Sequence, residues 1–204
     1  MKTHIGKWLD GHPLVKGRFR VLDACFRVAG TGSLGCRRYV FLFQDVEEPR
    51  KYLLIGMKEA LPSALQPWLT LPQPHWISEA ERVVAIQRRM QNVCPALLGT
   101  TLFQGRSYVV REMQPLEDKI NFLLVRDRYG DIACVVEDMA FLTASAQLRS
   151  AARQGAAGPD DLIDFGRNTH WQQSLLEYAM AYAARVTKDY QEYFTAYKAG
   201  YFAR

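Results

Sequence analysis

A glycine-rich stretch at residues 30–35, GTGSLG, is the first feature whose residue types and spacing could do chemistry. It reads G-x-G-x-x-G, a pattern found in loops whose backbone amides bind phosphate groups. A dinucleotide-binding fold needs a helix directly after these glycines, and a Walker-type loop needs Gly-Lys-Ser/Thr at its end. Here the strand-like segment RRYVFLFQ (37–44) follows, and Gly35 precedes Cys36. The sequence therefore argues against both of those phosphate-binding folds.

A glycine-rich hairpin of the protein-kinase type is the phosphate-binding option that remains. In that arrangement the loop joins the first two strands, a lysine on the third strand contacts phosphates, and a glutamate on the next helix holds the lysine. Lys58 lies in LIGMKEA (54–60), and Glu79 and Glu81 follow in a helical segment. The stretch YVVREMQP (108–115) stands where a hinge would meet the adenine. The simpler alternatives are a surface lysine on a strand and a glutamate that only caps its helix.

The acidic residues of phosphoryl transfer are not evident in the sequence. That chemistry uses a catalytic Asp and metal-binding Asp and Asn residues in the second lobe. No H-R-D-x-x-x-x-N or H-G-D stretch follows the glycine motif, and the Asp-Phe-Gly triplet at 164–166 has no catalytic loop before it. We therefore expect no catalytic and no metal-ligating residue in this chain, and no catalysis by the chain alone.

Hydrophobic periodicity predicts the elements that must position these residues. Strands are expected within 18–29, 37–44 and 51–60, and two more within 96–113 around a turn at Gln104-Gly105. Helices are expected at 78–91, where Ser78 and Glu81 form a capping box, and at 131–152 and 171–197.

These elements predict an α+β fold in two parts. Residues 1–117 would form a kinase-like glycine-loop lobe, with a five-stranded antiparallel sheet and one helix, and residues 118–204 a helical region. A tyrosine stripe on the last helix, which includes Tyr178, Tyr182 and Tyr190, is interpreted as core.

The composition is that of an ordinary soluble globular protein, with 204 residues, 49% of them hydrophobic and 23% charged. No apolar run reaches the roughly 20 residues that span a bilayer, and the N-terminus shows no signal peptide, so a cytoplasmic protein is expected. The four cysteines show no metal-site spacing. The net charge of +5 arises entirely in residues 1–60, which carry 11 Lys/Arg and 6 Asp/Glu. That charge would favour a phosphate ligand or a nucleic acid.

Five segments in order resemble the uncharacterised bacterial family known as domain of unknown function 2252, over residues 18–197. The members are longer, and their N-terminal half carries stretches that look like the catalytic loop and metal-binding Asp of aminoglycoside-kinase-like enzymes. The resemblance therefore implies the C-terminal half of a permuted kinase-like fold. Where the family often has a His in an A-H-x-R stretch, this chain has Gln147. The five segments are VLDACFRVAGTGSLGCRRYVFLF, LIGMKEALPSAL, AERVVAIQRRMQ, VVREMQPLEDKI and RQGAAGPDDLIDFG.

The resemblance implies a nucleotide site, with ATP and magnesium as the expected ligands. Lys58 would contact phosphate, Glu81 or Glu79 would orient it, and Arg111, Gln114, Asp118 and Lys119 would lie in the hinge segment without an assigned role. The expected nucleotide-binding residues are Gly30, Thr31, Gly32, Ser33, Gly35, Lys58, Glu81, Glu112 and Met113.

Three functions remain open at this point. The first is the nucleotide-binding half of a kinase-like phosphotransferase, which acts only with a separate chain that supplies the catalytic half. The second is a non-catalytic interaction module or truncated family member. The third is a nucleic-acid binder, suggested by Phe19, Phe26 and Tyr39 between arginines, although no known nucleic-acid motif appears. No membrane partner is expected.

Overall fold

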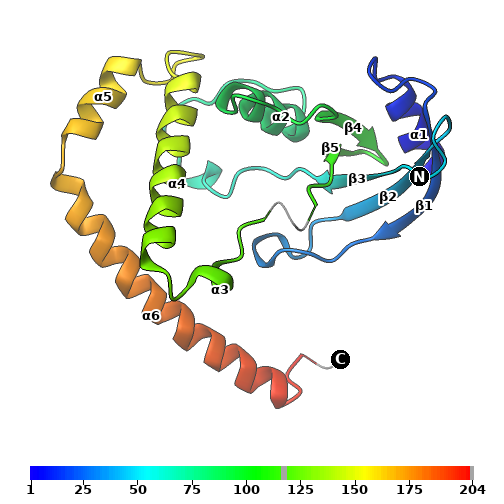
Figure 1. Ribbon diagram of the computed structural model, residues 1–204. Helices are drawn as coiled ribbons and strands as arrows, with labels where there is room; N and C mark the ends of the chain where they lie inside the picture. The colour runs from blue at the N-terminus through cyan, green and yellow to red at the C-terminus, as the bar shows by residue number, and fades with distance from the viewer. Residues whose placement is uncertain (116–118, 203–204) are drawn as a thin grey trace. The chain divides into compact units, whose positions relative to one another are not determined.

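The computed structural model describes residues 1–115 and 119–202. Its contacts divide the chain into two compact units, Met1–Gln154 and Gly155–Arg204. The first unit contains a five-stranded sheet in the order β1-β2-β3-β5-β4, and all neighbouring strands are antiparallel (Figure 1). The predicted α+β class and the five-stranded antiparallel sheet are therefore confirmed. The strands are β1 (Phe19–Phe26), β2 (Arg38–Asp45), β3 (Tyr52–Glu59), β4 (Gly99–Phe103) and β5 (Arg106–Glu112).

The turn between β4 and β5 forms as its residues dictate. Gln104 and Gly105 have φ angles of 51° and 72°, the left-handed pair that a two-residue hairpin turn needs. The expected turn at this position is confirmed.

An N-terminal helix, α1 (Lys2–Asp10), covers one face of the sheet and was not predicted. Ile5 and Leu9 are buried against the sheet. Trp8 donates from its indole Nε1 to the carbonyl of Thr100 over 2.8 Å. A Cβ on Gly99 would lie 2.8 Å from the Trp8 ring, so only glycine lets α1 approach β4 this closely. The main core of the protein lies between α1 and this face.

Helix α2 (Glu79–Met90) packs against β4 and β5 from the other side. The Ser78 side chain accepts from the Glu81 amide, and the Glu81 carboxylate accepts from the amide of Ile77 over 2.8 Å. These bonds satisfy donors that the first helical turn leaves open. The Ala80 amide also donates to Ser107 of β5. The helix start predicted at Ser78 is confirmed.

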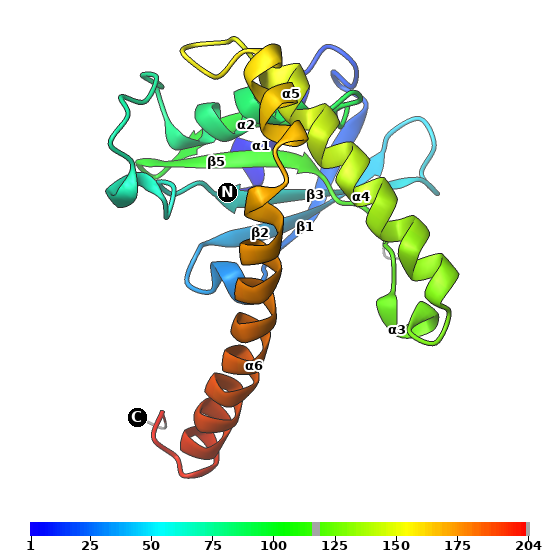
Figure 2. The same ribbon diagram turned by 90° about the vertical axis from the view of Figure 1, so that its left-hand side faces the viewer.

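Helix α4 (Tyr129–Ser150) follows the short helix α3 (Phe122–Val125) and packs against α2 (Figure 2). The expected boundary between the lobe and the helical region lay at 117/118. The contacts group α4 with the sheet and divide the chain at 154/155, while the kinase-like lobe of residues 1–117 stays a prediction.

The second unit consists of α5 (Pro159–Arg167) and α6 (His170–Lys198), and neither helix contains a buried residue. Tyr178, Tyr182 and Tyr190 are 65%, 53% and 61% exposed. Within this unit, the tyrosine stripe that was interpreted as core is therefore exposed. Helical periodicity identifies the face that another layer could cover, but it does not show that the same chain supplies that layer. None of the helices in the described residues combines the length and apolarity needed to cross a bilayer.

Candidate functional site

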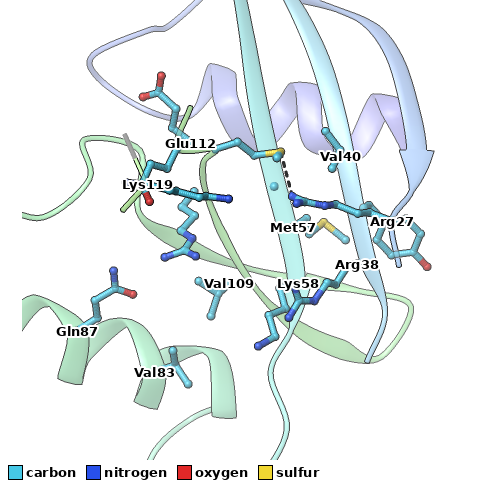
Figure 3. Close-up of a pocket in the computed structure, with 15 residues that line it drawn as sticks. Arg27, Arg38, Val40, Met57, Lys58, Val83, Gln87, Val109, Glu112 and Lys119 are labelled. Atoms are coloured by element: carbon cyan, nitrogen blue, oxygen red, sulfur yellow. Dashed lines mark hydrogen bonds between the residues drawn. The ribbon is translucent and has the colours of Figure 1, made fainter. Parts of the chain in front are cut away.

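A cleft of about 360 Å³ opens on the sheet face opposite α1, a volume in the range of small-molecule sites (Figure 3). Strands β2, β3 and β5, helix α2 and the segment after β5 all contribute to its wall. Lys58, Glu112 and Met113, three of the predicted nucleotide-binding residues, line it together. Fold formation therefore brings together residues that lie more than 50 positions apart in the sequence.

The wall of the cleft is strongly basic. Of the described residues that line it, five carry a cationic side chain and one, Glu112, carries a carboxylate. None of the five cations forms an ion pair with another described residue. Uncompensated like charges repel one another, so an anion in the cleft would relieve that repulsion. The five cations are Arg27, Arg38, Lys58, Arg111 and Lys119.

Strand alternation places two of these cations side by side. Arg38 of β2 lies directly opposite Lys58 of β3 in the antiparallel register, and Lys58 in turn lies opposite Val109 of β5. Residues at alternate positions, such as Phe41 and Met57, point to the core face and are fully buried there. Figure 3 shows Arg38 and Lys58 together at one end of the cleft, with Glu112 and Lys119 at the other.

Met113 and Arg27 close a further part of the wall. The Met113 amide donates to the carbonyl of Leu54 over 2.9 Å, which extends the β3–β5 pairing by one residue. The Arg27 guanidinium lies 3.7 Å from the Met113 sulfur, a weak contact that leaves its charge uncompensated (Figure 3). The predicted hinge segment therefore borders the cleft, with Arg111, Gln114 and Lys119 in its wall, while Asp118 lies outside the described residues.

The glycine motif joins β1 to β2, as a glycine-rich hairpin requires. Gly30 and Gly35 adopt φ angles of 77° and 88°, which side chains other than glycine rarely tolerate. Between them, residues 31–33 form a single 3₁₀ turn, with the Ser33 amide bonded to the carbonyl of Gly30 and the Cys36 amide to that of Ser33. In this conformation, Ser33 and Cys36 use their amides within the turn.

None of the described residues that line the cleft comes from 30–35. The predicted loop residues Gly30, Gly32, Ser33 and Gly35 therefore do not share a cavity with Lys58 in this conformation, and the side chain of Thr31 lies outside the described part of the structure. The Arg38 side chain connects the glycine loop to the cleft, because it lines the cleft and also donates to the Ser33 hydroxyl.

The expected pairing of Lys58 with a glutamate of α2 is not formed. Glu81 bonds to the amide of Ile77, and Glu79 forms a 2.7 Å ion pair with Arg82. Neither carboxylate has an ion pair with Lys58, whose side chain is exposed in the cleft. Capping the helix and complementing its dipole explain both glutamates here, which was the simpler of the two interpretations.

Glu59, next to Lys58 in sequence, faces the core and anchors the end of the glycine loop. Glu59 is 5% exposed. Its carboxylate accepts a hydrogen bond of 2.6 Å from the Arg106 guanidinium and one of 3.1 Å from the amide of Arg37. Burial opposes the ionised carboxyl, but the bonds from Arg106 and the Arg37 amide outweigh it and lower the pKa of Glu59. The charged carboxylate therefore fixes the stem of the loop to β3.

Tyr108 lies beside this ion pair, and its hydroxyl is buried without a hydrogen-bond partner among the described residues. Burial, together with nearby Tyr39 and Glu59, raises the pKa of Tyr108. The phenol therefore stays neutral and contributes packing against Tyr39, at a ring-centroid distance of 6.2 Å.

The sequence prediction missed Arg27, Arg38 and Glu59 as parts of this region. A signal for Arg38 was available, since residues 38 and 40 share one strand face while 39, 41 and 43 share the other. The role of Arg27 follows only from its distant neighbour Met113. Within the described residues, no cluster of three or more His, Cys, Asp or Glu side chains could hold a metal ion.

Comparison with known proteins gives a family but no characterised relative. Neither the curated proteins nor the solved structures contain a match. One protein family matches residues 2–196, almost the whole chain, and is described as an uncharacterized protein conserved in bacteria, DUF2252. The chain therefore belongs to this bacterial family of unknown function.

Proposed function

We propose that the cleft binds the phosphate groups of a nucleotide such as ATP, with magnesium bound to the nucleotide. The observation that carries the proposal is the group of five cationic side chains without ion-pair partners among the described residues. Arg guanidinium groups bind phosphate with two parallel hydrogen bonds, and Lys adds a compact point charge. Arg38 and Lys58, adjacent across β2 and β3, would take one phosphate group between them.

The order of the elements supports a kinase-like role. A glycine-rich hairpin joins the first two strands, Lys58 lies on the third, and a helix and two further strands lead to the cleft. Protein kinases use a glycine-rich loop and a third-strand lysine to hold nucleotide phosphates. The chain would then be the C-terminal, nucleotide-binding half of a permuted kinase-like phosphotransferase. A separate chain would supply the catalytic half, and this chain is assigned binding and positioning only.

Calorimetric titration with Mg-ATP tests the proposal. The parent protein should release or absorb heat with a single-site isotherm. Lys58→Ala should weaken binding by about tenfold or more, because hydrogen bonds to charged groups are worth about 1.5–3 kcal/mol. Binding should also weaken steadily as salt is added.

Lys51→Ala is the matched control, because Lys51 directly precedes β3 but forms an ion pair with Glu48 and does not line the cleft. It should bind Mg-ATP like the parent. No heat with the parent protein, or equal binding by the parent and Lys58→Ala, would contradict the proposal. If inorganic tripolyphosphate binds more tightly than Mg-ATP, the cleft is an anion site, but the proposal that its ligand is a nucleotide is wrong.

A non-catalytic interaction module is the second candidate, and the stripe on α6 favours it. Tyr190 and Phe194 stack at 5.9 Å, Tyr193 and Tyr197 stack at 6.3 Å, and all four are at least 40% exposed. Exposed aromatic surface of this kind is enriched where proteins bind other proteins.

Purification from the native cell separates the two candidates. Under the second, one companion protein accompanies the parent and Lys58→Ala equally, and Tyr190→Ser with Tyr193→Ser loses it. A protein that purifies without any companion would count against the interaction module.

A further inference from the structure

Arg38 is the side chain that joins the glycine loop to the cleft. We propose that Arg38 is itself a ligand of the bound anion and that it exchanges the Ser33 hydroxyl for that anion, which releases the loop. This inference rests on the proposed function, because it requires an anion in the cleft. It adds a route by which binding at Arg38 changes the loop.

The present contacts of Arg38 are with the loop. One guanidinium nitrogen donates to the Ser33 hydroxyl, and the same nitrogen lies 3.4 Å from the position that a Cβ on Gly30 would occupy. The absence of a side chain at Gly30 therefore leaves room for the guanidinium. We call the contact between Arg38 and Ser33 the latch.

Arg38 is under-satisfied in this latch. Its Nε is buried and has no hydrogen-bond partner among the described residues. Its opposite neighbour across the strand pair is Lys58, another cation. Like charges directly opposite on a sheet are unfavourable. Both features raise the free energy of the empty state, and both would be relieved by an anion that Arg38 and Lys58 share.

An anion would compete well with Ser33 for the guanidinium. A guanidinium and a phosphate group carry opposite charges, and the guanidinium fork can donate two parallel hydrogen bonds to phosphate oxygens. Ser33 offers one neutral hydroxyl. Because the ligand favours the state in which Arg38 has turned into the cleft, binding shifts the population toward a released loop.

The two stems of the loop limit what can move. Arg37 accepts from the amide of Glu59 at 2.9 Å and donates its own amide to the Glu59 carboxylate at 3.1 Å. Arg27 donates its amide to the carbonyl of Arg38 over 2.9 Å. The change is therefore confined to residues 30–36, where the amides of Ser33 and Cys36 become free to face a phosphate.

Ser33→Ala distinguishes the latch from a direct role of Ser33. Removing the hydroxyl frees Arg38, so affinity for Mg-ATP and for inorganic tripolyphosphate should rise by about two- to tenfold, the range that one hydrogen bond spans. If Ser33 instead contacts the ligand, the same substitution lowers affinity and the proposal is wrong. Unchanged affinity also overturns it.

Hydrogen–deuterium exchange measures the loop directly. In the parent, saturating tripolyphosphate should change amide exchange in residues 30–36, and Ser33→Ala should show faster exchange there without any ligand. Arg38→Gln should reproduce that fast exchange and lose affinity, while Arg38→Lys should keep part of the affinity but not the latch. Equal loop exchange in the parent and both Arg38 variants would overturn the proposal.

Arg27→Gln is the matched control, because Arg27 lines the cleft but contacts Met113 rather than the loop. It should lower affinity and leave exchange in residues 30–36 of the free protein unchanged. Binding with no change in loop exchange would reject the latch and keep the proposed function. Absence of binding by every probe would reject the proposed function and this inference together.

Discussion

The two faces of the sheet carry opposite properties although the same strands build them. On the face covered by α1, Phe41, Ile55 and Val110 have no exposed surface. On the cleft face, the neighbouring strand positions hold Arg38, Lys58 and Arg111. Apart from the buried carboxylate of Glu59, one face is apolar and closed, and the other is basic and open.

This difference separates stability from binding at the level of single residues. Burial of apolar surface is the dominant favourable contribution to folding, so the α1 face should determine the free energy of unfolding. The cleft face holds charges that repel one another, so its residues should contribute little or negatively to stability. We expect substitutions on one face to change unfolding and those on the other to change anion binding.

Phe41→Ala should have the largest effect on stability. Deleting a buried Phe side chain removes its burial free energy and leaves a cavity, at a typical cost of about 3–5 kcal/mol. Urea unfolding followed by circular dichroism measures the loss. Leu54→Ala is the control, because Leu54 lies on the cleft face and is 44% exposed. A loss at Leu54 as large as that at Phe41 would contradict the comparison.

Glu59→Gln should have the next largest effect. The substitution keeps the shape but weakens the bonds to Arg106 and the Arg37 amide, at a cost of about 1–3 kcal/mol. Urea unfolding again gives the value. Glu48→Gln, in an exposed ion pair with Lys51, should change stability by less than about 1 kcal/mol. Equal effects of the two substitutions would show that the anchor at the loop stem does not stabilise the fold.

Acid should lower the free energy of unfolding partly by protonating Glu59. The pKa of Glu59 is lower in the folded chain than in the unfolded one, so the unfolded state binds its proton first as pH falls. The stabilising contribution is complete above the ordinary Glu pKa of about 4.3 and is lost as pH falls through the lower folded value. Urea midpoints from pH 6 down to 2.5 should therefore fall less steeply for Glu59→Gln. If the urea midpoints of the parent and Glu59→Gln fall in parallel with pH, Glu59 does not contribute to the acid sensitivity.

Lys58→Gln should have the smallest effect on stability and the opposite sign. Removing one of two like charges that face each other across β2 and β3 should stabilise the free protein by up to about 0.5 kcal/mol. The gain should disappear at high salt, where the repulsion is screened. The same variant should bind Mg-ATP more weakly. A loss of stability on this substitution would mean that Lys58 has a structural role on the cleft face.

Local patterns predicted most of the elements. Ser78 and Glu81 indicated the start of α2, and Gln104-Gly105 indicated the β4–β5 turn, because capping and turn formation depend on neighbouring residues only. The spacing of Ile5, Trp8 and Leu9 also fits a helical face, although α1 was not predicted.

Contacts between distant segments could not be predicted in the same way. Glu81 had the right type and order to pair with Lys58, but the distance between a strand and the next helix depends on how the two pack. The periodicity of the α6 stripe predicted the helix correctly, but the stripe is exposed within its unit and not buried there. Periodicity identifies one face of a helix, but it does not show which segment packs on that face.

The sequence by itself determined the glycine hairpin, the five strands, the helices α2, α4 and α6, and the family, while α1, α3 and α5 were not predicted. These follow from local backbone preferences, side-chain alternation and residue identity. Only the tertiary structure decided that Arg27, Arg38, Lys58, Arg111 and Lys119 share one cleft, that Arg38 connects that cleft to the glycine loop, and that no glutamate of α2 pairs with Lys58. The physical reason is that strand register and helix placement are set by burial of the whole core, which no short stretch of sequence contains.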